Sequence, residues 1–239
     1  MSTESKRIQL IDAARGVAIL AMLVHHFLLS FGMVFPKVPL PLVNEPYFEP
    51  LHFFFVAVFL LISGICSHFS RNNIRRGLIV LAAALVVSAV TFVVLPESPI
   101  YFGILHLLGC CMVLYGLLSR FLEKLPTLPA AVLFLVAFLI YYYFFATAPR
   151  IATPHLYILG FPDYRFSSAD YFPLLPWLFL FLFGTVLGRP IAAHKLPRWF
   201  YETKVPVLAP IGRHTLLIYL LHQPVFLALL YLVRALLPQ

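Results

Sequence analysis

The stretch from Arg7 to Phe27, RIQLIDAARGVAILAMLVHHF, decides the fold of this chain. Between Gly16 and Val24 it contains only apolar residues, and the apolar pattern continues to about Val34. That length is close to the ~20 residues that an α-helix needs to cross the hydrocarbon core of a bilayer. The stretch therefore predicts a transmembrane helix. Its acid, its arginine and its two histidines are groups that such a helix normally excludes unless they have a function.

The composition of the whole chain agrees with this prediction. Of its 239 residues, 62% are hydrophobic and only 11% are charged. The mean hydropathy of +0.95 lies far outside the range of soluble globular proteins. The first apolar stretch is too long for a removable signal peptide, so we expect no cleaved targeting segment. All three cysteines lie in apolar runs and are expected to act as small hydrophobic side chains.

Seven apolar windows are long enough for tilted membrane helices. They cover residues 9–34, 51–69, 74–95, 101–119, 128–147, 171–188 and 211–236. Proline-rich or polar segments separate them, and the sequence shows no internal repeat, low-complexity tract or second domain. It therefore predicts an all-α polytopic membrane helix bundle of about seven transmembrane helices, in a single domain over residues 1–239.

The placement of lysine and arginine in and beside the short loops predicts the orientation, because cytoplasmic loops collect these residues. One side of the membrane has Lys6, Arg7, Arg71, Arg75, Arg76, Arg120, Lys124, Arg189, Lys195, Arg198 and Lys204. The other side has only Lys37, Arg150, Arg165 and Arg234. We therefore expect a cytoplasmic N-terminus and a C-terminus outside. The net charge of +8 follows from this bias, so membrane lipids and not nucleic acid are the expected partners.

Three polar residues share one face of the first predicted helix. At 100° per residue, His26 lies about 20° around the helix from Arg15, and Asp12 lies about 60° away. His26 is also roughly 16 Å deeper than Arg15. In one interpretation Asp12 pairs with Arg15, and His25 or His26 packs against a neighbouring helix. In the other, His26 accepts a proton, since histidine titrates near neutrality.

The fourth and last windows add further polar residues at membrane depth. His106 is expected about one and a half turns into its helix, where it could act as a base or bond to another helix. In the last window Thr215, Tyr219 and His222 form one stripe. Arg213 begins that window, level with Arg15, and two arginines at one rim could hold phosphates or contact lipid headgroups.

Three residues on the predicted outer side are candidates for binding an acceptor molecule. His52 lies at the outer rim of the second helix. It could serve catalysis or only lie at the membrane interface, and the sequence favours neither. Asp170 ends a long polar stretch and could hold a sugar group or cap the sixth helix. Trp177 could stack on a sugar or anchor that helix at the interface.

Five sequence blocks together resemble a known family. They are RIQLIDAARGVAILAMLVHHF, FFFVAVFLLISGICSHFSR, YFGILHLLGCCMVLYGLL, DYFPLLPWLFLFLFGTVLGR and IGRHTLLIYLLHQP. In this order they look like successive blocks of bacterial proteins similar to the catalytic domain of heparan-α-glucosaminide N-acetyltransferase. No single block is specific, but five in the same order are.

The resemblance implies an integral-membrane acyltransferase in the inner (cytoplasmic) membrane of a bacterium. It would move an acetyl group from cytoplasmic acetyl-CoA to an amine or hydroxyl of a sugar-containing acceptor, a glycan or glycolipid. Asp12, Arg15, Arg213 and His222 would line the acyl-CoA path. His52, Asp170 and Trp177 would bind the acceptor. We expect no metal cofactor, and a homodimer stays open.

In the expected reaction, His26 or His106 removes the acceptor's proton during direct attack on the thioester. His26 falls where the heparan-type enzyme has an asparagine, which suggests that it has taken over the proton transfer. A covalent route through Cys110 or Cys111 is less favoured because no activating partner is visible.

Two other classes of function remain open from the sequence. A proton-coupled transporter or flippase would use intramembrane histidines and Asp12 to relay protons, although the chain shows no paired inverted halves. A noncatalytic membrane partner of another enzyme would need only packing surfaces.

Overall fold

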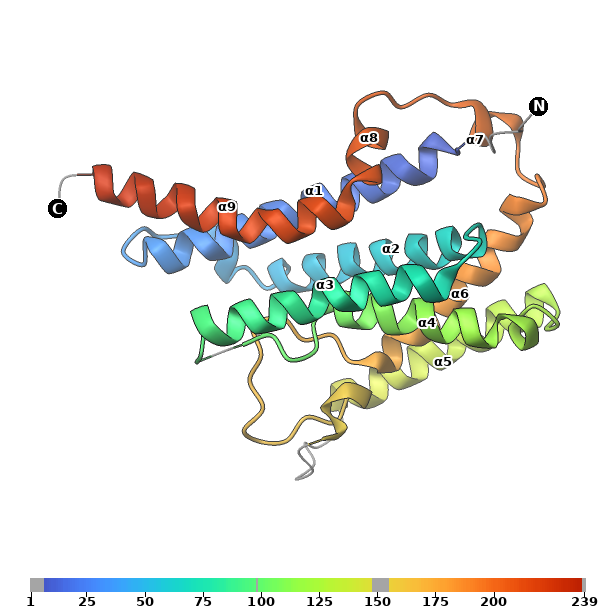
Figure 1. The fold of residues 1–239 in the computed structure, drawn as a ribbon, viewed down its shortest axis with the longest axis horizontal. Coiled ribbons are helices and arrows are strands. Elements are labelled where there is room, and N and C mark those ends of the chain that lie inside the picture. Colours follow the sequence, from blue (N-terminus) through green and yellow to red (C-terminus); the bar gives the residue numbers. More distant parts are fainter. Residues whose placement is uncertain (1–6, 98, 148–154, 238–239) are drawn as a thin grey trace. The chain divides into compact units, whose positions relative to one another are not determined.

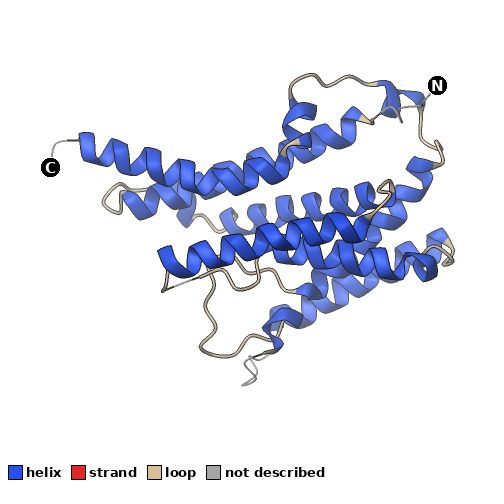
Figure 2. Ribbon diagram, viewed as in Figure 1, coloured by secondary structure: helices blue, strands red, loops and turns tan. Residues whose placement is uncertain are grey.

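The computed structural model of the chain describes residues 7–97, 99–147 and 155–237. The described residues form nine α-helices and two short 3-10 helices, joined by loops, and they include no strand (Figure 2). The α-helices are α1 Gln9–Val34, α2 Phe48–His68, α3 Asn73–Val94, α4 Ile104–Leu122, α5 Thr127–Thr147, α6 Leu174–Ala192, α7 Arg198–Glu202, α8 Leu208–Arg213 and α9 Thr215–Leu236. The 3-10 helices are η1 Pro41–Asn44 and η2 Leu156–Leu159.

Seven of the described helices, α1 to α6 and α9, are long and apolar enough to cross a membrane. This confirms the prediction of an all-α polytopic membrane protein with seven spans. The first predicted window, 9–34, coincides with α1. The orientation stays a prediction, and two of the residues used for it, Lys6 and Arg150, lie outside the described residues.

The last predicted window, 211–236, is wrong in one respect. His214, with φ −105° and ψ 19°, interrupts the helical backbone between α8 and α9. Arg213 therefore ends the short helix α8 instead of beginning the last membrane helix.

The chain forms two compact units, and each is described by itself. Unit 1 comprises the described residues of Met1–Phe59 and Leu196–Gln239, and unit 2 comprises those of Leu60–Lys195. The boundary falls inside α2. The single domain expected from the sequence stays a prediction.

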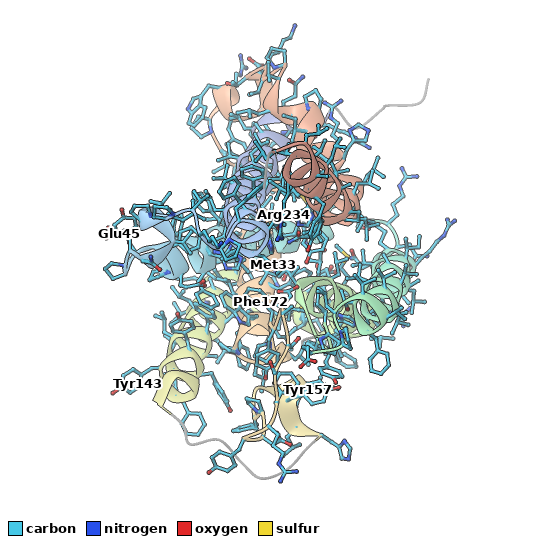
Figure 3. All side chains as sticks on the ribbon, turned by 90° about the vertical axis from the view of Figure 1, so that its left-hand side faces the viewer. Met33, Glu45, Tyr143, Tyr157, Phe172 and Arg234 are labelled. Atoms are coloured by element: carbon cyan, nitrogen blue, oxygen red, sulfur yellow. The ribbon has the colours of Figure 1, made fainter. Side chains whose placement is uncertain are left out.

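In unit 1, α1 packs against both α8 and α9 (Figure 1). Two glycines allow the α1–α8 contact: a Cβ on Gly16 would meet the carbonyl oxygen of Leu208, and one on Gly212 would meet that of Asp12. At the other end of α1, Arg234 of α9 donates a hydrogen bond from Nη1 to the Val34 carbonyl oxygen at 3.2 Å. Figure 3 labels Arg234 and Met33 at this end. Contacts near both ends therefore hold α1 within unit 1.

In unit 2, α3 packs against α4, and α5 against α6. Small residues also allow α2 and α6 to approach closely, because a Cβ on Gly64 would meet the Phe181 carbonyl oxygen and the Gly184 Cα. Helix α3 is capped by the Asn72 side chain, which accepts a hydrogen bond from the Arg75 amide at 2.8 Å. Small residues commonly allow membrane helices to pack this closely.

Candidate functional site

Four histidines of unit 1 gather into one group, here called the histidine cluster: His25, His26, His52 and His222. The rings of His25 and His52 stack with centroids 4.0 Å apart and planes 10° apart. His26 approaches His222 edge-on at 5.1 Å and His52 at 5.9 Å. Helices α1, α2 and α9 each supply at least one ring, so residues up to 197 positions apart in the sequence meet here.

A hydrogen-bonded chain orients His26. Its Nδ1 lies 3.2 Å from Nε2 of Gln223 on α9. The Oε1 atom of the same Gln223 side chain accepts a hydrogen bond from Ser30 Oγ at 2.9 Å. The Nε2 side of the His26 ring is therefore left for other chemistry.

His222 has a defined proton arrangement. Its Nδ1 lies 2.5 Å from the carbonyl oxygen of Tyr219, which can only accept, so Nδ1 must donate. In the neutral ring the lone pair is then on Nε2. This atom is buried and has no hydrogen-bond partner among the described residues. A buried imidazole lone pair beside His26 is a ready proton acceptor.

His25 is the least satisfied member of the cluster. Its side chain is 8% exposed, and neither ring nitrogen has a hydrogen-bond partner in the described part of the chain. Its Nε2 lies 3.8 Å from Glu49 Oε1, and His52 Nδ1 lies 3.9 Å from Glu49 Oε2, both too long for hydrogen bonds. A buried polar group left unpaired costs about 1–3 kcal/mol.

The predicted acyl-CoA residues also come together in unit 1, but in a different pairing from the one considered in the sequence. Asp12 Oδ2 accepts a hydrogen bond from Arg213 Nε at 3.2 Å. One interpretation of the sequence had paired Asp12 with Arg15. Arg15 Nη2 instead donates to Thr215 Oγ1 at 2.8 Å, and its buried Nε has no hydrogen-bond partner among the described residues. The polar faces of α1 and α9 therefore meet along their length, from Arg15 to Ser30.

His106 lies in unit 2 with both ring nitrogens occupied. The Gly103 amide donates to its Nδ1 at 3.3 Å. Its Nε2 lies 3.3 Å from Ser88 Oγ, whose own hydroxyl donates to the Ile100 carbonyl oxygen at 2.6 Å. Because Nδ1 accepts, Nε2 carries the proton and donates to Ser88. In this arrangement His106 ties the start of α4 to α3 and has no free lone pair.

The chain matches the model of the family described as "Heparan-alpha-glucosaminide N-acetyltransferase, catalytic" over residues 7–224. It belongs to this family. No curated protein and no solved structure matches the chain. The family is one of membrane acetyltransferases that in general use acetyl-CoA as donor, which agrees with the resemblance of the five sequence blocks. The matched range includes the whole histidine cluster.

In unit 2, two of the residues predicted to bind an acceptor make contacts within the protein. Asp170 Oδ2 accepts a hydrogen bond from the Ile104 amide at 3.0 Å, so it caps α4 rather than the sixth membrane helix. Trp177 is 5% exposed, and its ring lies against Phe172 at 5.6 Å and Phe138 at 5.8 Å. Their acceptor role stays a prediction.

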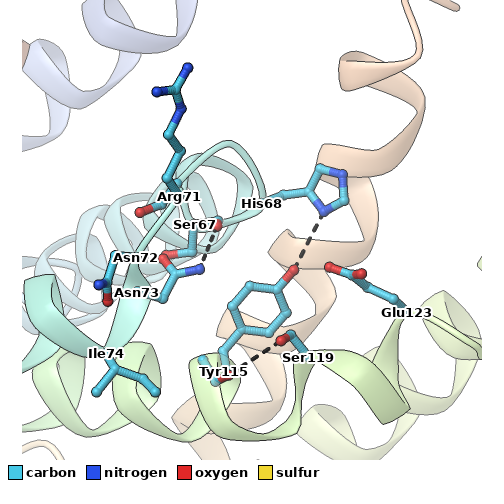
Figure 4. A pocket seen from close by; sticks show the side chains of 11 residues that line it. Ser67, His68, Arg71, Asn72, Asn73, Ile74, Tyr115, Ser119 and Glu123 are labelled. Atoms are coloured by element: carbon cyan, nitrogen blue, oxygen red, sulfur yellow. Dashed lines mark hydrogen bonds between the residues drawn. The ribbon is translucent and has the colours of Figure 1, made fainter.

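Unit 2 of this acetyltransferase family member also contains a polar hollow of about 180 Å³, lined by the α2–α3 turn and the second half of α4 (Figure 4). Asn73 Nδ2 donates to the Ser67 carbonyl oxygen at 2.8 Å, and His68 Nδ1 lies 3.4 Å from the Tyr115 hydroxyl. The first contact closes the α2–α3 turn, and the second joins the end of α2 to α4.

Sequence reasoning proposed no catalytic or binding role for four residues of the cluster and its surroundings: His25, Ser30, Glu49 and Gln223. The paired histidines at 25 and 26 were one available signal, because consecutive helical positions can face two neighbouring helices. The spacing of Glu49 and His52, three residues apart at the start of a helix, was another.

Proposed function

We propose that the chain is an integral-membrane acyltransferase that moves an acetyl group from cytoplasmic acetyl-CoA to an amine or hydroxyl of a sugar-containing acceptor. The observation that supports this best is the unpartnered, buried Nε2 lone pair of His222 beside His26. Transfer to an amine or hydroxyl needs a group that accepts a proton during attack. The histidine cluster supplies such a group, and α1, which has two of its rings, also has Arg15.

The proton is taken by the His26–His222 pair in this proposal. The acceptor's nitrogen or oxygen forms a bond to the thioester carbonyl carbon while its proton passes to an imidazole. The carbon–sulfur bond then breaks, and the proton moves on to the CoA sulfur. His106 is the less suitable base because both of its ring nitrogens are occupied.

The donor's phosphates bind at the Asp12, Arg15 and Arg213 end of α1 in this proposal. The Nε–H of Arg15 is an unused donor in the described structure, and the Arg213 side chain is 36% exposed. Charge-assisted hydrogen bonds from guanidinium groups suit phosphate well. The pantetheine arm would follow the α1–α9 contact towards the cluster, roughly 16 Å deeper by helix rise.

Acetyl-CoA binding is tested by thermal unfolding of the purified full chain in detergent. A ligand that binds only the folded state stabilises it by mass action, by about 2.7 kcal/mol at a free concentration of 100 times its Kd. We expect acetyl-CoA to raise the Tm. An unchanged Tm at millimolar acetyl-CoA would contradict the proposed donor and favour a transporter.

The role of His26 is tested in the same preparation with His26→Ala. We expect this variant to lose acetyl transfer while it keeps the Tm increase with acetyl-CoA, because the substitution leaves both arginines in place. The measurement is release of free CoA thiol in the presence of amine- and hydroxyl-bearing sugars. Turnover equal to that of the wild type would remove His26 from the mechanism.

A further inference from the structure

We propose that His25, His26 and His52 hold a divalent transition-metal ion of the zinc type. One ligand atom from each of the three residues can be chosen so that all lie within 4.8 Å of one another. Two come from consecutive positions of α1 and the third from the start of α2. This inference goes beyond the proposed function and departs from the metal-free site expected from the sequence.

The spacing of the ligand atoms is close to that of a metal shell. Three atoms 4.8 Å apart would each lie about 2.8 Å from their common centre, compared with a usual Zn–N distance of about 2.0–2.1 Å. Each ligand atom must therefore move inwards by about 0.7 Å. Rotation of the imidazole rings about their side-chain bonds supplies such a movement. It also turns His25 and His52 out of their parallel stack, so that both lone pairs can point to one ion.

An independent observation at His25 also points to a bound ion. His25 is 8% exposed, and both of its ring nitrogens have no hydrogen-bond partner among the described residues. Buried polar groups in folded proteins are normally satisfied, and an unsatisfied one calls for an explanation such as a bound ion. A neutral imidazole nitrogen is a preferred ligand of zinc and its neighbours in the transition series.

The groups around the three histidines fit the surroundings of a metal site. A metal-bound histidine usually donates its second ring N–H to an oxygen that fixes the ring. Gln223 can accept from His26 Nδ1 through its carbonyl oxygen if its amide group turns over, and its NH₂ then donates to Ser30 Oγ. Both hydrogen bonds survive this exchange. Glu49, near His25 and His52, supplies a negative charge close to the ion.

Three histidines are the protein ligands of one type of catalytic zinc site, in which a fourth position stays open. His222, whose ring centroid lies 5.1 Å from that of His26 and whose Nε2 has no hydrogen-bond partner among the described residues, is the nearest candidate to interact with that position. With an ion bound, the His26 lone pair is used for the metal, so His222 alone is then the proton acceptor of the proposed function. The inference itself needs only the three ligands, and it does not depend on acetyl transfer.

The test measures metal content. The full chain, purified in detergent without a polyhistidine tag, is loaded with zinc sulfate, desalted and analysed for zinc by mass spectrometry. The variants His25→Phe and His52→Phe keep a flat ring but lose the ligand nitrogens. His155→Phe makes the same substitution at an exposed histidine of unit 2 and serves as the control.

We expect about one zinc ion per chain in the wild type and in His155→Phe, and an at least tenfold lower content in both cluster variants. Thermal unfolding in the presence of a chelator shows whether each variant is folded. Zinc should raise the Tm of the wild type and of the control only. A wild type that retains no zinc, or equal zinc in all four proteins, overturns the inference, whether or not acetyl-CoA binds.

Discussion

At the scale of single residues, the partner of each imidazole decides what that imidazole can do. The Tyr219 carbonyl oxygen forces the proton of His222 onto Nδ1 and leaves Nε2 with a lone pair. In His106 the proton is on the other nitrogen, because the Gly103 amide donates a hydrogen bond to the lone pair of Nδ1. Two histidines buried to the same extent, each 7% exposed, are thus suited to different tasks.

This difference predicts the effect of His222→Ala. General acid–base catalysis typically contributes 10²- to 10⁴-fold, so we expect acetyl transfer to fall by about that factor with acetyl-CoA binding retained. The measurement is the initial rate of CoA release at saturating acetyl-CoA. His155→Ala, at an exposed position far along the sequence, is the control. A wild-type rate in His222→Ala would show that its lone pair is not the base.

Part of this residue-level arrangement could be predicted from the sequence. Helical spacing put Arg15 and His26 on one face and Thr215 and His222 on one stripe, and the structure brings the two faces together. Spacing within one helix says nothing about partners on another. For that reason the sequence could not predict that Asp12 pairs with Arg213, 201 residues away, or that His25 meets His52.

At the scale of helices, the contact between α1 and α8 depends on the absence of side chains. The backbones approach so closely at Gly16 and Gly212 that a Cβ at either position would meet a carbonyl oxygen of the other helix. This contact also brings the Asp12 and Arg213 side chains together. A short helix of six residues is therefore fixed mainly by its fit against a long one.

We expect Gly212→Ala to destabilise the protein by about 1–3 kcal/mol, the usual cost of overpacking a tight contact. The measurement is the Tm of the purified chain. The matched control is Gly32→Ala on α1, where a Cβ would lie 3.3 Å from only the flexible end of the Leu40 side chain. Equal Tm values for the two variants would show that the α1–α8 contact is looser than described.

The helices themselves were largely predictable. Apolar windows and breaks gave all seven membrane-length helices, because hydropathy and helix length are local properties of the sequence. The interruption at His214 was missed, since hydropathy averaged over the window 211–236 does not show a break of the helical backbone at one residue. Capping of the helix next to it in sequence was one of the two roles left open for Asp170, and its carboxylate instead accepts a hydrogen bond from the start of α4.

At the scale of the whole molecule, the seven membrane-length helices predict that α1 begins and α9 ends on opposite sides of a membrane. The excess of lysine and arginine then predicts the α1–α2 connection outside and the segment around α7 in the cytoplasm. With acetyl-CoA in the cytoplasm, this orientation puts the Arg15 end of α1 on the donor's side. The histidine cluster lies towards the other end of the same helix.

The orientation is tested with Glu45→Cys and Glu202→Cys, two exposed glutamates in these two segments. The three native cysteines are replaced by alanine. We expect a membrane-impermeant maleimide to label Glu45→Cys in intact cells, and Glu202→Cys only after the membrane is opened, because charged reagents do not cross it. The reverse pattern of labelling would invert the topology.

The ion pair between Asp12 and Arg213 has a consequence for the choice of donor. In the proposed function, a phosphate that binds Arg213 must replace a carboxylate that is already there, 3.2 Å away. A ligand with a single weak negative charge gains little from such an exchange, whereas a polyphosphate offers more charge than it displaces. In the proposed function Asp12 therefore competes with the donor's phosphate for Arg213, and the site would select against small acyl thioesters that lack the nucleotide part of CoA.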